Sequence, residues 1–244
     1  MFKRIFIIAF LLSAMVSTIT AKPVFLVYCG ITMAQPIEAI AKKIESEFDV
    51  NIHVVKGGSG KLYQTLTKSF HGDLFLPGSD SYIKKLKKEH QGMVVDEVSV
   101  GKNQLAVFVK KGNPKQIPLN LDSLYDHNYR VFIGSAKMGS VGKVTKAILE
   151  KKGIYEQVKK NARMTSHSKG LLNAIKNNKS DITLNWHAVS TWPGNNEFVE
   201  AMSVPASIAT PKKLVLAQLN SSKNPVIAKA FCHPTRFLIL PIYS

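Results

Sequence analysis

The sequence is poor in cysteine and in acidic residues. Its 244 residues contain two cysteines, Cys29 and Cys232, and 16 Asp and Glu against 33 Lys and Arg. Small secreted domains without a large core are usually held by several disulfides, so this cysteine count excludes that class. Cys29 directly follows an apolar run, which favours a buried thiol. A Cys29–Cys232 disulfide is compatible with the sequence but does not follow from it.

Motifs for catalysis and nucleotide binding are also lacking. The seven histidines are scattered without the H-E-x-x-H spacing of zinc proteases, and no G-x-S-x-G nucleophile elbow occurs. The stretch G-G-S-G-K-L at 57–62 lacks the hydroxyl residue that a Walker loop carries after its lysine. We therefore expect no enzyme activity, no metal ion and no cofactor. An exported hydrolase with Ser59 as nucleophile is the alternative, although no base can be assigned to it.

Apolar runs of membrane-spanning length are absent, but a shorter one stands at the N-terminus. Lys3 and Arg4 precede the apolar run 5–16, and small or polar residues follow up to Ala21. This order is typical of a signal peptide, so residues 1–21 are expected to be removed by a cut near Ala21. A retained anchor is the alternative. We expect the mature protein to be exported and soluble.

The formal net charge of +17 would suit an anionic partner. The lysines occur in short groups at 84–88, 151–152 and 159–160, with no aromatic residues interleaved as a single-strand stacking surface would need. We interpret them as solvated helix faces and expect no nucleic-acid partner.

Strand-like and helix-like segments alternate along the chain, which is typical of a layered α/β fold. Strands are expected at 24–28, 50–55, 73–76, 104–110, 129–133, 181–185 and 213–219, with helices between most of them. The prediction is two Rossmann-like α/β lobes joined by a two-segment hinge near 101–109 and 201–216. Residues 22–104 and 214–244 would form lobe 1, and 105–213 would form lobe 2.

Small and hydroxyl residues precede four of the expected helices. They stand at 29–32, 57–60, 139–142 and 166–168, after strands in both expected lobes. Ligands of open α/β sheets bind beyond the carboxyl ends of the strands, where helix N-termini offer free N–H groups and partial positive charge. Each loop alone could be an ordinary helix cap. Together, the four loops predict an anion site shared by two lobes.

Several stretches resemble the periplasmic binding proteins of molybdate-type ABC transporters, which have the type II binding-protein fold. The matching segments are V-Y-C-G-I-T-M-A-Q-P-I-E-A-I-A at 27–41, G-G-S-G-K-L at 57–62, G-D-L-F-L-P-G-S-D-S-Y-I at 72–83, V-K-K-G-N-P at 109–114 and G-S-V-G-K at 139–143. The resemblance covers roughly residues 23 to 230. It implies a monomeric periplasmic protein that closes on a small oxyanion and passes it to a membrane permease.

The resemblance also implies the residues that hold the anion. Carried over by position, they are Thr32, Ser59 with neighbouring Gly58, Val141 with neighbouring Ser140, Ser168, and Trp186 with neighbouring Asn185. Thr32 stands where the family commonly has Ser, and Trp186 where it has Tyr. An indole donates a hydrogen bond but accepts none, unlike a phenol. The ligand is thus left open among molybdate, tungstate, another oxyanion such as phosphate or sulfate, and a small carboxylate.

The end of the chain departs from the family pattern. A helix begins at 227–231, but Cys232-His233-Pro234 interrupts it and an apolar tail follows. Proline is poorly tolerated inside a helix. We expect a frameshifted or truncated terminus, with a divergent native tail as the alternative.

Overall fold

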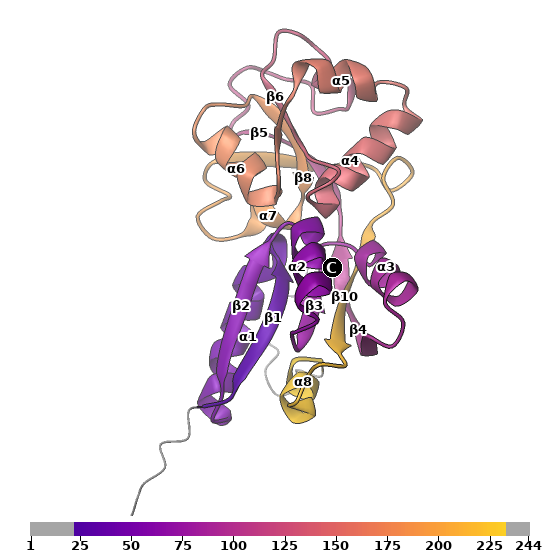
Figure 1. Cartoon of the computed structure of the whole chain (residues 1–244). Helices are drawn as coiled ribbons and strands as arrows, with labels where there is room; N and C mark the ends of the chain where they lie inside the picture. Colours follow the sequence, from indigo (N-terminus) through magenta and orange to yellow (C-terminus); the bar gives the residue numbers. More distant parts are fainter. Residues whose placement is uncertain (1–21, 233–244) are drawn as a thin grey trace, which may run out of the picture.

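The computed structural model describes residues 22–232, which form two α/β lobes, each built on one sheet (Figure 1). The predicted fold class is confirmed. The signal peptide predicted at 1–21 and the tail after Cys232 lie outside the described residues. Within residues 22–232, no helix has the length and apolar character needed to cross a membrane.

Lobe 1 contains a five-stranded sheet with the order β2-β1-β3-β10-β4. Its strands are β1 (Val24–Gly30), β2 (Asn51–Gly57), β3 (Leu74–Leu76), β4 (Val94–Asn103) and β10 (Lys212–Leu219). Strands β1, β2 and β3 are parallel, whereas β10 runs antiparallel to both β3 and β4. The carboxyl ends of β1 and β2 therefore lie at the same edge of the sheet.

Helices cover both faces of this sheet. They are η1 (Ile31–Met33), α1 (Ala34–Glu47), α2 (Ser59–Ser69), α3 (Ser81–Glu89) and α8 (Pro225–Cys232). The apolar faces of α1 and α8 pack on one side, where Phe25 stacks on Phe231 with 5.8 Å between ring centroids. Helices α2 and α3 pack on the other side around Leu66 and Phe75. Apolar residues spaced at three and four along these helices produce this burial.

Lobe 2 contains a second five-stranded sheet with the order β7-β6-β8-β5-β9. Its strands are β5 (Leu105–Lys110), β6 (Val131–Gly134), β7 (Arg163–Thr165), β8 (Ile182–Trp186) and β9 (Val199–Ser203). Its helices are η2 (Asp122–Leu124), α4 (Ser140–Lys151), α5 (Tyr155–Asn161), α6 (Ser168–Lys176) and α7 (Ala188–Thr191). A single hydrophobic core joins these elements.

Two segments connect the lobes, between β4 and β5 and between β9 and β10 (Figure 1). They are hydrogen-bonded to each other: the Gln104 side-chain amide donates to the Val204 carbonyl, and the Val204 N–H donates to the Leu105 carbonyl over 2.8 Å. These hydrogen bonds hold the two connecting segments together where the chain passes between the lobes.

The expected strand list was incomplete, because it omitted β4, β7 and β9. β4 is an edge strand paired only with β10, and most of its residues are exposed or half-buried. β7 has three residues and β9 is the opposite edge of its sheet. Edge strands and very short strands carry little of the apolar alternation on which the prediction relied.

Both cysteines are buried free thiols in the core between α1, α8 and the sheet. The expected burial of Cys29 is therefore confirmed, and the two thiols are not joined in a disulfide. Burial raises the pKa of the Cys232 thiol to about 11 and raises that of Cys29 further.

Candidate functional site

The four predicted loops, two from each lobe, line one small cavity between the sheets, together with Gly78 after β3. The loops follow β1, β2, β6 and β7 and lead into η1 with α1, α2, α4 and α6. Measured as the space that the centre of a water molecule can occupy, the cavity is about 10 Å³. Six of the eight predicted site residues line it: Thr32, Gly58, Ser59, Ser140, Val141 and Ser168.

Lobe 1 contributes Ser59, the first residue of α2, with Gly58 as its N-cap. The Ser59 side chain is buried, and its hydroxyl oxygen accepts a hydrogen bond from the Gly78 N–H over 2.9 Å. A hydroxyl that accepts in this way still has its own proton to donate. Ser59 is thus oriented by Gly78 and retains a donor for a ligand.

Thr32 and Ser168 bring the two lobes together at the cavity. Both are buried, and the Thr32 hydroxyl donates to the Ser168 hydroxyl over 3.4 Å, a long hydrogen bond. A ligand oxygen placed between these two hydroxyls could accept a hydrogen bond from each of them. The contact therefore marks a position where a ligand could bridge the lobes.

The lobe 2 half of the cavity consists of two helix N-termini. Ser140 and Val141 begin α4 after the N-cap Gly139, and Ser168 begins α6 after the N-cap His167. N–H groups in the first turn of a helix have no acceptor within the helix, and the helix dipole places partial positive charge there. The arrangement favours an anion without using a charged side chain.

The other two predicted residues, Asn185 and Trp186, lie behind the cavity wall rather than in it. Asn185 is fully buried; its side-chain amide donates to the Ser168 carbonyl over 3.0 Å and accepts from the Trp186 N–H over 2.9 Å. Trp186 is 1% exposed and belongs to the lobe 2 core. From these positions Asn185 supports the loop that carries Ser168.

Sequence reasoning missed Gly78, which also lines the cavity, and included His167 only as part of the loop 166–168, without assigning it a role. Gly78 donates to Ser59, and its carbonyl accepts from the buried Asn103 amide over 2.9 Å. A Cβ atom at position 78 would lie 2.4 Å from the Ser140 hydroxyl oxygen of the other lobe. A larger residue at position 78 would therefore force the Ser140 hydroxyl to move. The turn-like Pro77-Gly78 pair was the available signal, and it was interpreted only as the end of a strand.

The cavity is electrically neutral apart from the helix ends. None of its lining residues is a lysine, arginine, aspartate or glutamate. Burial, together with the nearby ammonium groups of Lys169 and Lys61, lowers the pKa of His167 below its usual value, so the ring is neutral at pH 7. Among residues 22–232, no cluster of His, Cys, Asp and Glu could hold a metal ion. The cavity therefore offers neutral hydrogen-bond donors.

A larger and more open depression of about 860 Å³ lies elsewhere on lobe 2. Its lining includes the carboxylates of Asp122 and Asp126, together with Pro118, Asn120, Ser123, Tyr125, His127, Asn128 and Gln157. It involves one lobe only and carries acidic groups, so it lacks both features that make the cavity between the lobes suited to an anion.

A family model described as bacterial extracellular solute-binding protein matches residues 25–234. A Haemophilus influenzae protein described as a binding protein is 29% identical over 135 residues, covering 54% of this chain and 52% of the relative. The chain thus aligns with about half the length of that relative.

Solved structures share the fold. The periplasmic molybdate-binding protein of Azotobacter vinelandii has a TM-score of 0.70 at 14% identity, covering 85% of this chain and 90% of the other. A periplasmic thiamin binding protein has a TM-score of 0.69 at 18% identity, covering 86% and 77%. These two proteins share one fold, but their names give very different ligands. The ligand of this chain therefore has to be argued from the cavity and not from the fold.

Proposed function

Since the chain belongs to the bacterial extracellular solute-binding proteins, we propose that it captures a small oxyanion between its lobes. The oxyanion is of the molybdate or tungstate kind, with phosphate, sulfate or a small carboxylate as alternatives. We further propose that the protein works as a periplasmic monomer and delivers the anion to the membrane permease of an ABC importer.

The observation that carries the proposal is the cavity between the lobes, which is lined by helix N-termini and hydroxyls of both lobes. Thr32 and Ser59 come from lobe 1 and Ser140 and Ser168 from lobe 2, all buried. A ligand that touches both lobes stabilises the closed arrangement through contacts it cannot make when the lobes are apart. In this structure the cavity has room for about one water molecule, so an oxyanion would enter it only with the lobes slightly further apart.

Charged lining groups are absent, which bears on the kind of anion. A carboxylate in the cavity could accept a hydrogen bond from the hydroxyl group of a protonated anion, but the lining contains no carboxylate. Hydroxyl and N–H donors complement a fully ionised oxyanion such as molybdate or sulfate. We therefore expect phosphate, which carries a proton near neutral pH, to bind more weakly.

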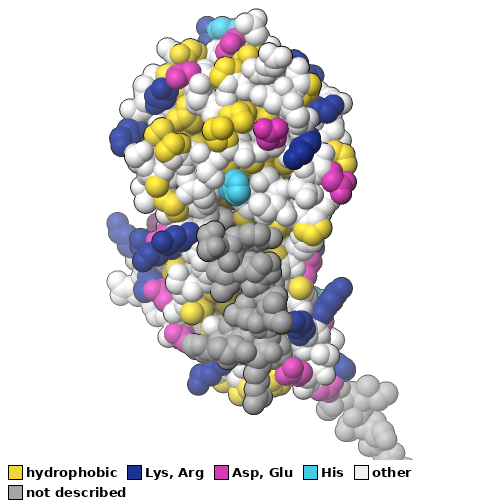
Figure 2. All heavy atoms as spheres, turned by 180° about the vertical axis from the view of Figure 1, so that it is seen from behind, with side chains coloured by type: hydrophobic (Ala, Val, Ile, Leu, Met, Phe, Trp, Pro, Cys, Tyr) yellow, Lys and Arg dark blue, Asp and Glu magenta, His cyan; other side chains and the backbone are white. Residues whose placement is uncertain are grey.

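Two other functions receive less support. For a hydrolase, a serine would need a base, but no hydrogen bond joins His167 to a serine within residues 22–232, and its Nδ1 accepts from the Gly170 N–H instead. For nucleic-acid binding, a continuous basic surface would be needed. On the face that Figure 2 shows, lysine and arginine side chains instead stand in separate groups with acidic side chains between them. On α3, for example, Lys84 pairs with Asp80 and Lys85 with Glu89.

Isothermal titration with molybdate, tungstate, sulfate and phosphate tests the proposal. We expect saturable one-to-one binding of at least one anion, with the fully ionised anions ahead of phosphate. An absence of heat from all four, together with unchanged melting temperatures at high anion concentration, would refute the oxyanion function.

A further inference from the structure

His167 lines the anion cavity but has no role in the predicted site. It is half-buried and stands immediately before Ser168, at the N-cap of α6. Its ring is the one titratable side chain among the residues that line the cavity. A group in this place experiences the charge of whatever the cavity holds.

A hydrogen bond fixes the tautomer of the neutral His167 ring. Nδ1 accepts from the Gly170 N–H over 3.2 Å, so in the neutral ring the proton is on Nε2, which is a donor. The same Gly170 N–H also donates to the His167 carbonyl over 3.0 Å. Gly170 therefore retains an acceptor if Nδ1 becomes protonated, and the start of α6 can persist with a charged ring.

The charged groups that act on His167 come from both lobes. Lys169 belongs to α6, and Lys61 belongs to α2 of lobe 1. Both are cationic, and no carboxylate lines the cavity to balance them. Negative charge is thus missing around the ring, and an anion in the cavity would supply it.

We propose that His167 is a further contact for the anion and that it makes anion binding stronger as the pH falls. The inference rests on the proposed oxyanion function. At about pH 8 the ring is neutral in both the empty and the loaded protein and contributes one neutral donor. At lower pH the loaded protein takes up a proton on His167 before the empty protein does, because the bound anion favours the imidazolium.

The direction of the effect follows from linkage. An anion that raises the pKa of His167 must in turn bind more tightly to the protonated protein. The gain begins as the pH falls through the pKa of the loaded form and is complete below the pKa of the empty form. Each unit by which the anion raises that pKa corresponds to about a tenfold gain in affinity.

The experiment is a calorimetric titration of the full-length mature chain with molybdate, and with sulfate as a second probe that stays fully ionised. Titrations at about pH 8 and about pH 6 are each run in two buffers of different ionisation enthalpy, which reports proton uptake. The test variant is His167→Asn, because asparagine is a good N-cap and does not titrate. The control is His127→Asn, an exposed histidine of the same lobe.

For the wild type and His127→Asn, we expect roughly tenfold tighter binding at the lower pH and heats that depend on the buffer. For His167→Asn, we expect affinity that does not change with pH and heats that do not depend on the buffer. Anion binding by the wild type without proton uptake, or equal proton uptake by His167→Asn, would overturn the role of His167 and leave the proposed function intact. If the wild type binds neither molybdate nor sulfate, and neither tungstate nor phosphate, both the role of His167 and the proposed function are overturned.

If His167→Asn does not fold, the NMR titration of the His167 ring in the wild type, with and without molybdate, decides instead. An unchanged ring pKa contradicts the proposal.

Discussion

The backbone N–H of Gly60 in lobe 1 donates to the carbonyl of Met138 in lobe 2 over 3.1 Å. This hydrogen bond lies beside the cavity and joins the lobes directly through main-chain atoms. Gly58 and Gly60 both lack room for a side chain here, because a Cβ atom at Gly58 would lie 2.5 Å from the Met138 carbonyl oxygen. Gly58 and Gly60 therefore allow the lobes to meet, which is a separate requirement from binding an anion.

Substitution of Gly60 by alanine is expected to prevent full closure. The added Cβ would lie 2.6 Å from the Lys137 carbonyl oxygen and 3.0 Å from that of Met138, and main-chain atoms cannot move aside as a side chain could. We expect anion affinity to fall about tenfold or more, a cost of about 1.4 kcal/mol. The melting temperature of the ligand-free protein should be unchanged or higher, since alanine favours a helix. Titration calorimetry measures the first effect and calorimetric melting the second.

Gly57→Ala serves as the control for closure. Its Cβ would contact only the Leu62 side chain of its own lobe, at 3.4 Å. In small-angle scattering, wild type and Gly57→Ala should show the same compact form with saturating molybdate, whereas Gly60→Ala should remain more extended. If Gly60→Ala is as compact as the wild type and binds equally well, the lobes do not depend on this contact.

Ser59→Ala should weaken anion binding by about 1–3 kcal/mol, the range for losing a hydrogen bond to a charged group. The serine hydroxyl is held by Gly78 and faces the cavity, so the substitution removes one donor and leaves the Gly78 N–H without its acceptor. The matched control is Ser46→Ala on the exposed surface of α1, which should bind like the wild type. Unchanged affinity in Ser59→Ala would remove this residue from the site.

Much of the fold could be predicted from the sequence because its inner elements carry strong periodic patterns. The helix α4, which follows the expected strand 129–133, has buried Val141, Val144 and Ile148 on one face. The edge strands were missed for the opposite reason: β4 faces solvent along most of its length. Burial on one or both sides produces the pattern that sequence reasoning detects, and edges lack it.

The site could be predicted only in part, because its geometry depends on the approach of two lobes. Helix-start residues such as Ser59 and Ser140 were found from local spacing. Gly78 was missed because its constraint comes from Ser140, which is distant in sequence. Trp186 was placed by resemblance alone. All five residues of β8 are buried, so no alternation indicates which of its side chains reach the cavity.

The buried cysteines should remain unmodified in the native protein. High pKa values disfavour the reactive thiolate, and both thiols lie inside the core of lobe 1. We expect a thiol reagent to label neither Cys29 nor Cys232 under native conditions and to label both after unfolding in denaturant, as read by intact mass. A native mass lower by two hydrogens, or a melting temperature lowered by reductant, would show a disulfide instead.

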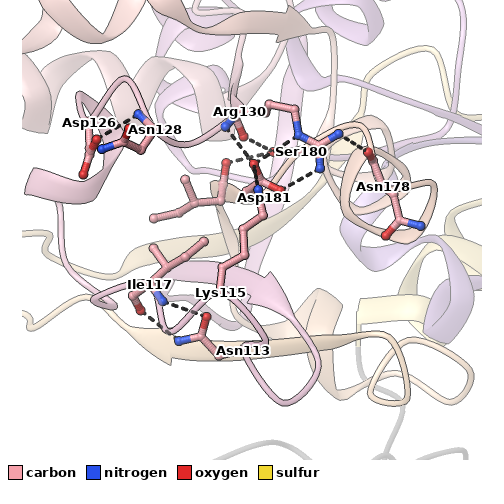
Figure 3. A network of polar contacts seen from close by, with 10 residues as sticks. Asn113, Lys115, Ile117, Asp126, Asn128, Arg130, Asn178, Ser180 and Asp181 are labelled. Atoms are coloured by element: carbon pink, nitrogen blue, oxygen red, sulfur yellow. Dashed lines mark hydrogen bonds and ion pairs between the residues drawn. The ribbon is translucent and has the colours of Figure 1, made fainter.

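Asp181 holds together one end of lobe 2 (Figure 3), and its removal should destabilise that lobe. One carboxylate oxygen accepts from the Arg130 guanidinium over 2.7 Å; the other accepts from the Arg130 backbone N–H and from the Lys115 ammonium, each over 2.9 Å. The carboxylate is 5% exposed, whereas its cationic partners are about half exposed. Asp181→Asn removes the charge but retains the shape, and we expect a loss of about 2–3 kcal/mol in the free energy of unfolding.

The same network predicts how stability depends on acid. Although burial acts to raise the pKa of Asp181, its hydrogen bonds to Arg130 and Lys115 hold that pKa well below its usual value. A carboxylate with a depressed pKa contributes its stability above the unfolded-state value, near pH 4, and loses it as the pH falls further. The free energy of unfolding of the wild type, measured with denaturant, should therefore decrease below about pH 4. The difference in this free energy between the wild type and Asp181→Asn should shrink there.

Asp122→Asn is the control. The Asp122 side chain is 53% exposed and pairs over 3.0 Å with Lys152, whose side chain is 39% exposed. Exposed pairs contribute about 0–1 kcal/mol, so this variant should unfold almost like the wild type at every pH. Equal losses in the two variants would mean that the Asp181 network adds no more than an ordinary surface pair. A gap between Asp181→Asn and the wild type that persists undiminished at low pH would show that packing, and not the carboxylate charge, provides the stability.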